Sequence, residues 1–162
     1  MAEMTFCPWC GDMLEIKRID GIRRSVCPKP ECGYIFWNNP IPVVAAILER
    51  AGKVVLVRNQ GWPEKWFGLV SGFLEKGETP EQGMRREIEE ELGLESTAVS
   101  FLGLYSFFER NELILAFHVT ARGTISPSEE IAAYREIPIE KLKPWPFGTG
   151  PAVADWLKSR RK

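Results

Sequence analysis

The sequence predicts an α/β sandwich, with a mixed sheet between helices, preceded by a small β module. Three observations support this: apolar β-branched runs alternate with turns, two segments have helical spacing, and all four cysteines precede residue 33. A chain of 162 residues has room for one ordinary domain and a small module. We expect the module over residues 1–38 and the larger domain over residues 39–162.

The first module is marked by its cysteines, Cys7-Pro-Trp-Cys10 and Cys27-Pro-Lys-Pro-Glu-Cys32, and a glycine follows each pair. This pattern resembles a zinc ribbon, in which four thiolates (Cys7, Cys10, Cys27 and Cys32) hold a structural Zn²⁺. Disulfides are one alternative, but no secretory signal pattern precedes the cysteines. A second alternative is a redox-active Cys-x-x-Cys motif. Such a motif is expected at a strand-to-helix turn of a βαβ unit, whereas here it opens the chain beside a second cysteine pair. The expected strands are Met13–Ile19, Ile22–Val26 and Tyr34–Trp37, with a hairpin turn at Asp20-Gly21.

The larger domain begins after the junction Asn38-Asn39-Pro40-Ile41-Pro42. A hydrophobic content of 44% supports a real core. Apolar runs bounded by turn residues predict its strands at Val43–Leu48, Val54–Val57, Leu69–Ser71, Val99–Glu109, Leu113–Thr120 and Ala132–Glu136. The segment Ala152–Lys158 predicts a closing helix.

A second helix is predicted between Thr79 and Gly93. Thr79 suits the N-cap, Pro80 suits the first helical position, and Gln82 completes a capping box. Gly93 is a natural stop. The apolar stripe of this helix consists of Met84, Ile88 and Leu92.

Carboxylates gather beside that stripe. Glu87, Glu90 and Glu91 stand at i, i+3 and i+4, and therefore share one narrow face of the helix. One interpretation is a solvated face paired with neighbouring arginines; the other is a site for a hard divalent cation such as Mg²⁺. The glycines Gly72 and Gly77 of the preceding loop favour the cation, because a loop that brings backbone atoms beside a metal needs glycine.

The stretch Gly72–Leu94 resembles the signature of Nudix hydrolases, G-x5-E-x7-R-E-U-x-E-E-x-G-U, in which U is a bulky aliphatic residue. Every defined position is filled. The filled positions are Gly72, Glu78, Arg86, Glu87, Ile88, Glu90, Glu91, Gly93 and Leu94. The resemblance implies a Nudix α/β/α sandwich that uses Mg²⁺ or Mn²⁺ to hydrolyse a nucleoside diphosphate linked to another moiety.

The same resemblance implies a role for each position. Glu87, Glu90 and Glu91 would bind the metal, and the backbone carbonyl of Ser71 would be a further ligand. Arg86 and Glu78 would brace the loop against the helix.

A glutamate outside the signature often completes such a site. The stretch Ser128-Glu129-Glu130-Ile131 resembles the one that supplies it. Glu130 is therefore expected as the fourth catalytic and metal-binding carboxylate, with Glu129 as the alternative. Which glutamate acts as the general base stays open.

Substrate contacts lie outside the signature. Phe73 is the leading candidate for stacking a base, and Arg58 is a candidate phosphate contact. Trp62, Trp66 and Phe67 are further loop aromatics. A zinc ribbon followed by a Nudix domain resembles the branch of NADH pyrophosphatases and plant FAD pyrophosphatases. Those NADH enzymes carry a Trp-Pro-Phe array soon after the signature, whereas here Pro144-Trp145-Pro146-Phe147 lies far downstream, and its binding role stays open.

Composition and charge limit the classes of partner that we expect this chain to bind. A net charge of −1 gives no general argument for nucleic acid or a membrane surface, and no apolar run approaches the roughly 18 residues of a membrane span. Reduced thiols in a zinc site fit a cytoplasmic protein. Because Nudix enzymes acting on dinucleotides often form dimers, the resemblance also suggests a homodimer.

These observations lead to one main hypothesis: a divalent-metal-dependent pyrophosphatase that releases AMP from a substrate of the ADP-ribose, NADH or FAD type. Capped RNA ends are an extension with the same catalytic site. The alternative from another class is a catalytically weak Nudix-fold regulator that binds nucleotides or RNA and uses the ribbon for nucleic acid. Salt-sensitive RNA binding without hydrolysis would favour the regulator.

Overall fold

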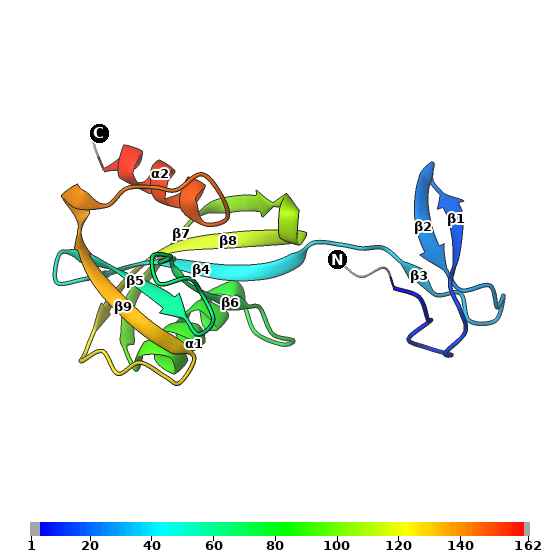
Figure 1. The fold of residues 1–162 in the computed structure, drawn as a ribbon, viewed down its shortest axis with the longest axis horizontal. Helices are drawn as coiled ribbons and strands as arrows, with labels where there is room; N and C mark the ends of the chain where they lie inside the picture. Colours follow the sequence, from blue (N-terminus) through cyan, green and yellow to red (C-terminus); the bar gives the residue numbers. More distant parts are fainter. Residues whose placement is uncertain (1–3, 161–162) are drawn as a thin grey trace. The chain divides into compact units, whose positions relative to one another are not determined.

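The computed structural model describes residues 4–160. They form two compact units, and the boundary along the chain falls between Pro40 and Ile41. The unit that precedes Ile41 is a three-stranded antiparallel sheet in the order β1-β2-β3 (Figure 1). Its strands are β1 (Glu15–Ile19), β2 (Ile22–Val26) and β3 (Ile35–Phe36). Asp20 and Gly21 both have positive φ, as a two-residue hairpin turn requires.

The outer strands of this sheet are shorter than the sequence predicts. Met13 makes only an isolated bridge to Phe6. The reason is the loop around the first cysteine pair, where the Cys7 and Gly11 amides donate to Asp12 and Cys7 carbonyls at 2.7 and 2.8 Å. These bonds turn the chain and keep residues before Glu15 out of the ladder.

The second unit is built on a six-stranded mixed sheet with the order β7-β8-β4-β5-β9, in which β6 pairs with β4 beside this path. Its strands are β4 (Ile41–Arg50), β5 (Lys53–Asn59), β6 (Val70–Phe73), β7 (Glu95–Phe107), β8 (Glu112–Arg122) and β9 (Ile131–Pro138). β4 runs parallel to β8, and the other pairings are antiparallel. Because β4 pairs with β5 only over Leu48–Arg50 and with β6 over Val43–Ala46, the sheet divides between β5 and β6.

Two helices cover opposite faces of this sheet (Figure 1). Helix α1 (Pro80–Leu92) packs Met84, Ile88 and Leu92 against one buried cluster. Helix α2 (Gly150–Ser159) packs Val153 and Trp156 against the other. Alternate residues of β4 and β5 point into the two clusters, as expected for strands buried on both sides. The predicted α/β/α sandwich behind a small β module is therefore confirmed.

Most strands and helix α2 differ from their predicted bounds by one or two residues, and the largest difference is at β7. β7 begins at Glu95 rather than Val99, because Glu95 and Thr97 bond to Arg122 and Thr120 of β8. The same strand ends at Phe107, since the chain then forms a 3-10 turn, η1 (Phe108–Arg110). β4 includes Pro42, which lies in the expected junction; its carbonyl accepts from the Leu74 amide at 3.2 Å.

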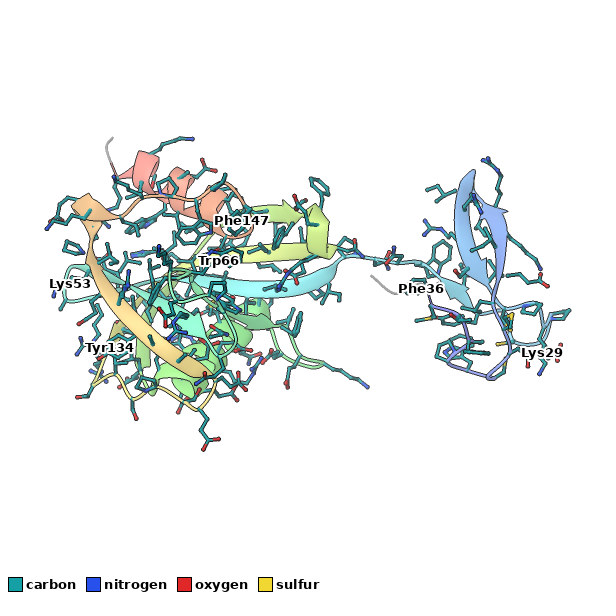
Figure 2. The ribbon with its side chains drawn as sticks, viewed as in Figure 1. Lys29, Phe36, Lys53, Trp66, Tyr134 and Phe147 are labelled. Carbon is teal, nitrogen blue, oxygen red and sulfur yellow. The ribbon has the colours of Figure 1, made fainter. Side chains whose placement is uncertain are left out.

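The remaining connections include a second 3-10 turn, η2 (Ile139–Lys141), after β9. The loop from β5 to β6 and the segment before α2 each present an aromatic ring, Trp66 and Phe147, and these rings lie side by side (Figure 2). Neither helix of the described residues is long and apolar enough to span a membrane.

Candidate functional site

Helix α1 carries the acidic signature, and its ends follow the predicted caps. The Thr79 side chain accepts from the Gln82 amide at 3.2 Å, and the Gln82 side chain accepts from the Thr79 amide at 2.8 Å. Gly93 ends the helix with φ 65°, in the left-handed region, and its amide donates to the Glu89 carbonyl. These caps fix the helix register, and with it the side on which the glutamates lie.

Close packing between β6 and α1 depends on Gly72. A Cβ atom at this position would overlap the carboxylate of Glu87. Gly72 therefore lets the backbone of β6 approach the side chain of Glu87 directly. This contact explains in physical terms why the signature begins with glycine.

Arg86 ties the loop before α1 to the helix. Its guanidinium bonds to both carboxylate oxygens of Glu78, at 2.7 and 3.1 Å. It also donates to Glu87 at 2.8 Å, to Glu90 at 3.0 Å and to the Phe73 carbonyl at 3.1 Å. These contacts raise the pKa of Arg86 and lower that of Glu78, in both cases chiefly through their mutual hydrogen bonds. The arrangement is the bracing that the signature implies.

The glutamates of α1 line a cleft of about 350 Å³ together with residues of the loop before β9. The lining residues are Glu87, Glu90, Glu91, Ser128, Glu129 and Glu130. Two backbone bonds hold that loop: the Ser128 amide donates to the Glu91 carbonyl at 2.9 Å, and the Gln60 amide donates to the Glu130 carbonyl at 2.8 Å. The structure thus brings Glu130 and Glu129, both outside the signature, to the same cleft as the helix glutamates.

Glu91 is the most unusual residue of this cleft. It is only 4% exposed, and its Oε2 atom has no hydrogen-bond partner among the described residues. Burial, followed by the charges of Glu87, Glu130 and Glu90, raises the pKa of Glu91 to about 8. Burial likewise raises the pKa of Glu87, against the opposing effect of Arg86. A buried carboxylate without a partner is costly unless a cation or a proton compensates it.

This donor set fits a divalent cation. Carboxylate oxygens are the ligands that Mg²⁺ and Mn²⁺ prefer, and the unpartnered Oε2 of Glu91 supplies a free lone pair inside the cleft. Among the residues that the structure describes, the cysteine thiols converge closely enough to hold an ion as they stand, whereas the carboxylates are not gathered into such a group. Like charges repel, so a cation is what would draw the carboxylates together.

The other predicted residues lie at different places. Ser71 stands in β6, opposite Ala45 and directly before Gly72, the residue that packs on Glu87. Phe73, at the end of β6, is 59% exposed. Arg58 lies at the bulge that ends β5, and it donates weakly to the Trp62 carbonyl at 3.5 Å. Neither Phe73 nor Arg58 lines the carboxylate cleft, so their substrate roles stay predictions.

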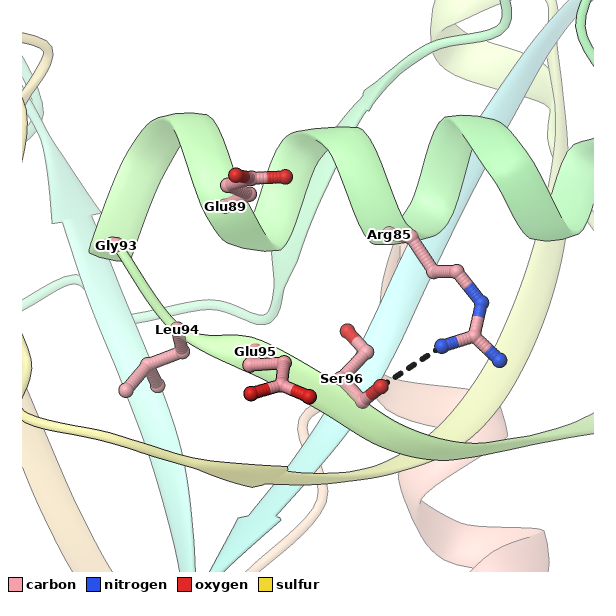
Figure 3. A pocket seen from close by; sticks show the side chains of 6 residues that line it. All are labelled: Arg85, Glu89, Gly93, Leu94, Glu95 and Ser96. Atoms are coloured by element: carbon pink, nitrogen blue, oxygen red, sulfur yellow. Dashed lines mark hydrogen bonds between the residues drawn. The ribbon is translucent and has the colours of Figure 1, made fainter.

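A second hollow of about 280 Å³ lies between the end of α1 and the start of β7 (Figure 3). Arg85, Glu89, Gly93, Leu94, Glu95 and Ser96 line it. Arg85 is held there by the Ser96 carbonyl at 2.8 Å and by Glu81 at 3.0 Å. Its arginine is already paired, and the buried unpartnered atom of its lining is the neutral hydroxyl of Ser96, whereas in the carboxylate cleft that atom belongs to the carboxylate of Glu91.

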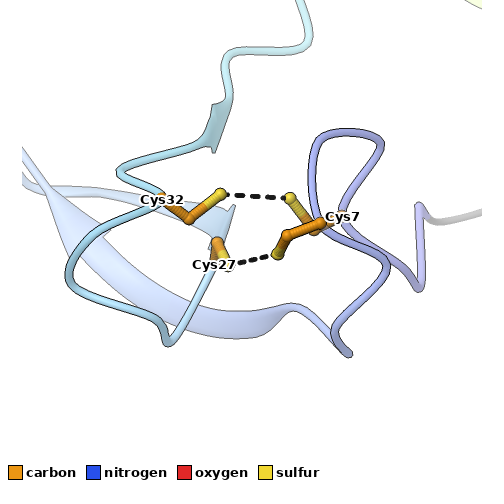
Figure 4. A group of neighbouring side chains, drawn as sticks. Cys7, Cys27 and Cys32 are labelled. Carbon is orange, nitrogen blue, oxygen red and sulfur yellow. Dashed lines mark hydrogen bonds between the residues drawn. The ribbon is translucent and has the colours of Figure 1, made fainter.

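The four cysteines form a compact cluster in the first unit (Figure 4). All four sulfur atoms lie within 4.8 Å of one another, with Sγ distances of 3.6 Å for Cys7–Cys32 and 3.5 Å for Cys10–Cys27. None of the four forms a disulfide. Burial raises the pKa of Cys27. Burial opposes ionisation of Cys7 too, but hydrogen bonds from the Trp9 and Cys10 backbone, together with those to the Cys32 and Cys10 thiols, lower the pKa of Cys7 to about 7. Four thiols in this arrangement suit a tetrahedral Zn²⁺ site.

Comparisons with known proteins agree with this geometry. A model of the NUDIX domain matches residues 39–156. The chain is 29% identical over 143 residues to a protein of Pseudomonas aeruginosa named NAD-capped RNA hydrolase NudC; the match covers 87% of this chain but only 50% of that protein. It is 36% identical over 90 residues to the Mycobacterium tuberculosis protein of that name, covering 56% of this chain and 28% of the relative. The chain thus spans at most about half the length of these relatives.

Solved structures give the same result for the fold. A crystal structure of a NUDIX hydrolase from Nitrosomonas europaea superposes with a TM-score of 0.74 and 26% identity, covering 86% of this chain and 80% of that one. A MutT structure reported for Aliivibrio salmonicida and Vibrio cholerae superposes with a TM-score of 0.64 and 21% identity, covering 75% of this chain and 99% of that one, and supports the fold alone. The family model covers well over half of the chain, and the signature lies on the helix–loop framework described above. The chain belongs to the NUDIX domain family.

Proposed function

We propose that this protein is a metal-dependent pyrophosphatase that hydrolyses the diphosphate linkage of a nucleotide derivative and releases AMP. The observation that carries the proposal is the buried, unpartnered carboxylate of Glu91, which lines one cleft with Glu87, Glu90 and Glu130. Such a site is unfavourable by itself and becomes favourable with a cation and a phosphate-bearing substrate.

The carboxylates would hold Mg²⁺ or Mn²⁺: Glu87, Glu90, Glu91 and Glu130 by side-chain oxygens, and Ser71 by its backbone carbonyl. When bound, the metal supplies charge neutralisation and a more acidic water. Arg86 keeps Glu87 and Glu90 on one side of the cleft through its bonds at 2.8 and 3.0 Å. A glutamate not fully engaged as a ligand can take the proton from the attacking water. Glu130 suits this role, since it is exposed in a loop that two backbone bonds hold against the cleft.

The NAD type of substrate is supported by the relatives whose names refer to NAD-capped RNA. NADH, ADP-ribose and FAD share an adenosine diphosphate, and a capped RNA end offers the same kind of linkage. The first unit would bind a structural Zn²⁺ through its four thiols, because so small a sheet has little core of its own. A thiolate zinc site fits a cytoplasmic location, and a homodimer stays a further prediction.

The test is a substrate panel of NADH, ADP-ribose, FAD and NAD-capped RNA, with Mg²⁺ and without it, followed by identification of the products. We expect AMP, or a 5′-monophosphate RNA end, only with the metal. Matched variants are Glu90→Gln, at an exposed cleft residue, and Glu89→Gln, at an exposed helix residue that does not line this cleft. If wild type turns over no member of the panel and binds RNA in a salt-sensitive manner, the regulator hypothesis replaces this one.

A further inference from the structure

Two exposed aromatic rings from distant segments meet on the second unit. Trp66, in the loop between β5 and β6, is 57% exposed, and Phe147, just before α2, is 50% exposed. Their ring centroids are 6.1 Å apart with an interplanar angle of 48° (Figure 2). Single exposed aromatic residues are common on proteins, but a pair built from two loops is an apolar surface of the kind that binds flat ligands.

Both rings stand on anchored backbone. Phe67 follows Trp66, and Trp145 lies two residues before Phe147; both of these neighbours pack against the core beneath α2. A Cβ atom on Gly150 would overlap the Trp145 carbonyl, so the backbone is closely packed at the start of α2. The Gly150 amide also donates to the Phe147 carbonyl at 3.0 Å. The exposed pair is therefore preorganised, which lowers the entropy cost of binding.

Positive charge lies beside Phe67, the neighbour of Trp66 in the chain. The guanidinium of Arg135 lies 4.1 Å from the ring centroid of Phe67. Arg135 pairs with Leu56 across β9 and β5, and Arg58 stands two residues further along β5. Alternate residues of a strand share a face, so both arginines lie on the face that Leu56 shares with the α2 core.

Neither arginine is neutralised in the part of the chain that the structure describes. The ion pairs found among residues 4–160 include no carboxylate within 4.0 Å of Arg58 or Arg135. An aromatic pair with two available guanidinium groups complements a ligand that has both a ring and negative charge.

A short stretch of chain connects this surface to the residues beside the carboxylate cleft. Gly68 bridges to Val57 of β5, and β6 then leads to Ser71 and to Gly72, which packs on Glu87. Trp66 stands five positions before Ser71, so their Cα atoms are at most roughly 18 Å apart. A nucleotide whose diphosphate lies beside Ser71 and Glu87 would therefore have at most about this distance to cover before its base meets Trp66.

We propose that Trp66 and Phe147 stack the nucleobase of the substrate, while Arg58 and Arg135 attract its negative charge. This inference rests on the proposed pyrophosphatase function and assigns base recognition to residues outside the signature. We favour Trp66 and Phe147 over Phe73 for stacking the base, because Phe73 makes no ring contact among the described residues.

The test measures binding rather than turnover, by titration calorimetry of AMP and of ribose 5-phosphate, its base-free counterpart. Base–aromatic stacking is worth about 1–3 kcal/mol per base, so Trp66→Ala and Phe147→Ala should each weaken AMP binding by roughly 5- to 150-fold. Ribose 5-phosphate should bind both variants as it binds wild type. Trp66→Phe should restore most of the affinity. The control is Phe101→Ala, because Phe101 is also 57% exposed and makes one ring contact, with Phe117 at 5.5 Å.

Three results would overturn the inference. One is AMP affinity that is unchanged in both alanine variants. Another is an equal loss for AMP and ribose 5-phosphate, which would indicate a phosphate or folding effect. The third is a change of oligomeric state in light scattering with AMP affinity unchanged, which would make the pair a contact between copies of the chain. Since AMP binding needs no turnover, these outcomes are distinct from failure of the pyrophosphatase proposal, in which the substrate panel yields no product.

Discussion

Replacing Glu91 by glutamine should stabilise the protein when no magnesium or manganese is added. Glutamine keeps the shape of the side chain but cannot ionise. Glu91 is 4% exposed and has an unpartnered oxygen. Its ionisation in the folded state therefore opposes folding unless a cation is present.

The sign and size of this effect follow from the pKa of Glu91, about 8 in the folded state against an ordinary value of 4.5. Below pH 4.5 both states are protonated, and Glu91 contributes no pH dependence. Between those values the folded state retains a proton that the unfolded chain loses, so stability falls as pH rises. At about 1.4 kcal/mol per pKa unit, the penalty above pH 8 has an upper limit of roughly 5 kcal/mol.

The assay is thermal unfolding of wild type and Glu91→Gln from pH 4.5 to 9, without added magnesium or manganese. The variant should melt higher than wild type, and the gap should open as pH rises toward 8, by about 2–4 °C for each kcal/mol. Magnesium should raise the melting temperature of wild type more than that of the variant. Glu89→Gln, at an exposed position of the same helix, is the control. Melting temperatures of wild type and Glu91→Gln that change in parallel with pH would refute the reasoning.

Three further predictions test other parts of the structure. Gly72→Ala should reduce kcat by about 10²-fold, because the added Cβ would displace the Glu87 carboxylate. The control is Gly103→Ala, which should keep activity because its Cβ meets only the Tyr105 ring at 3.4 Å. Arg86→Lys should lower stability by about 1–3 kcal/mol in denaturant unfolding, since lysine cannot replace the fork that binds Glu78, and an unchanged midpoint would contradict the bracing role. Cys27→Ser should reduce bound zinc well below the ~1 equivalent expected by elemental analysis and expose the first unit to proteolysis; full zinc retention would contradict the ribbon site.

Local signals made the acidic helix predictable in detail. Thr79, Pro80, Gln82 and Gly93 specify both ends of α1 through contacts only a few residues apart, and each contact is present. Hairpin turns such as Asp20-Gly21 are equally local. The boundaries of β7 were harder, because polar Glu95 and Thr97 look like loop residues and become strand only by bonding to β8. Its two bulges also break the alternation on which strand prediction depends.

The candidate site shows the same contrast between features that local sequence determines and features that only the folded chain determines. Spacing alone places Glu87, Glu90 and Glu91 on one face, but only the folded chain shows that Glu91 is buried without a partner. The pairing of Trp66 with Phe147 has no local signal, since their segments meet only because Phe67, Leu69 and Trp145 pack with α2 around one core. Trp66 and Phe147 each stand out in the sequence, but neither their contact nor the position of Arg135 can be read from local spacing.

The most direct test of the central proposal is the rate of AMP release from ADP-ribose and NADH as free Mg²⁺ is raised from zero, for wild type and Glu90→Gln. Glu90 is exposed, with 60% of its side chain accessible, so the substitution should leave the fold intact. We predict a saturable dependence on Mg²⁺ for wild type and a rate on the order of 10²-fold lower in the variant. AMP release that is independent of the metal, or equal in the two proteins, would contradict a catalytic centre built on the carboxylates of α1.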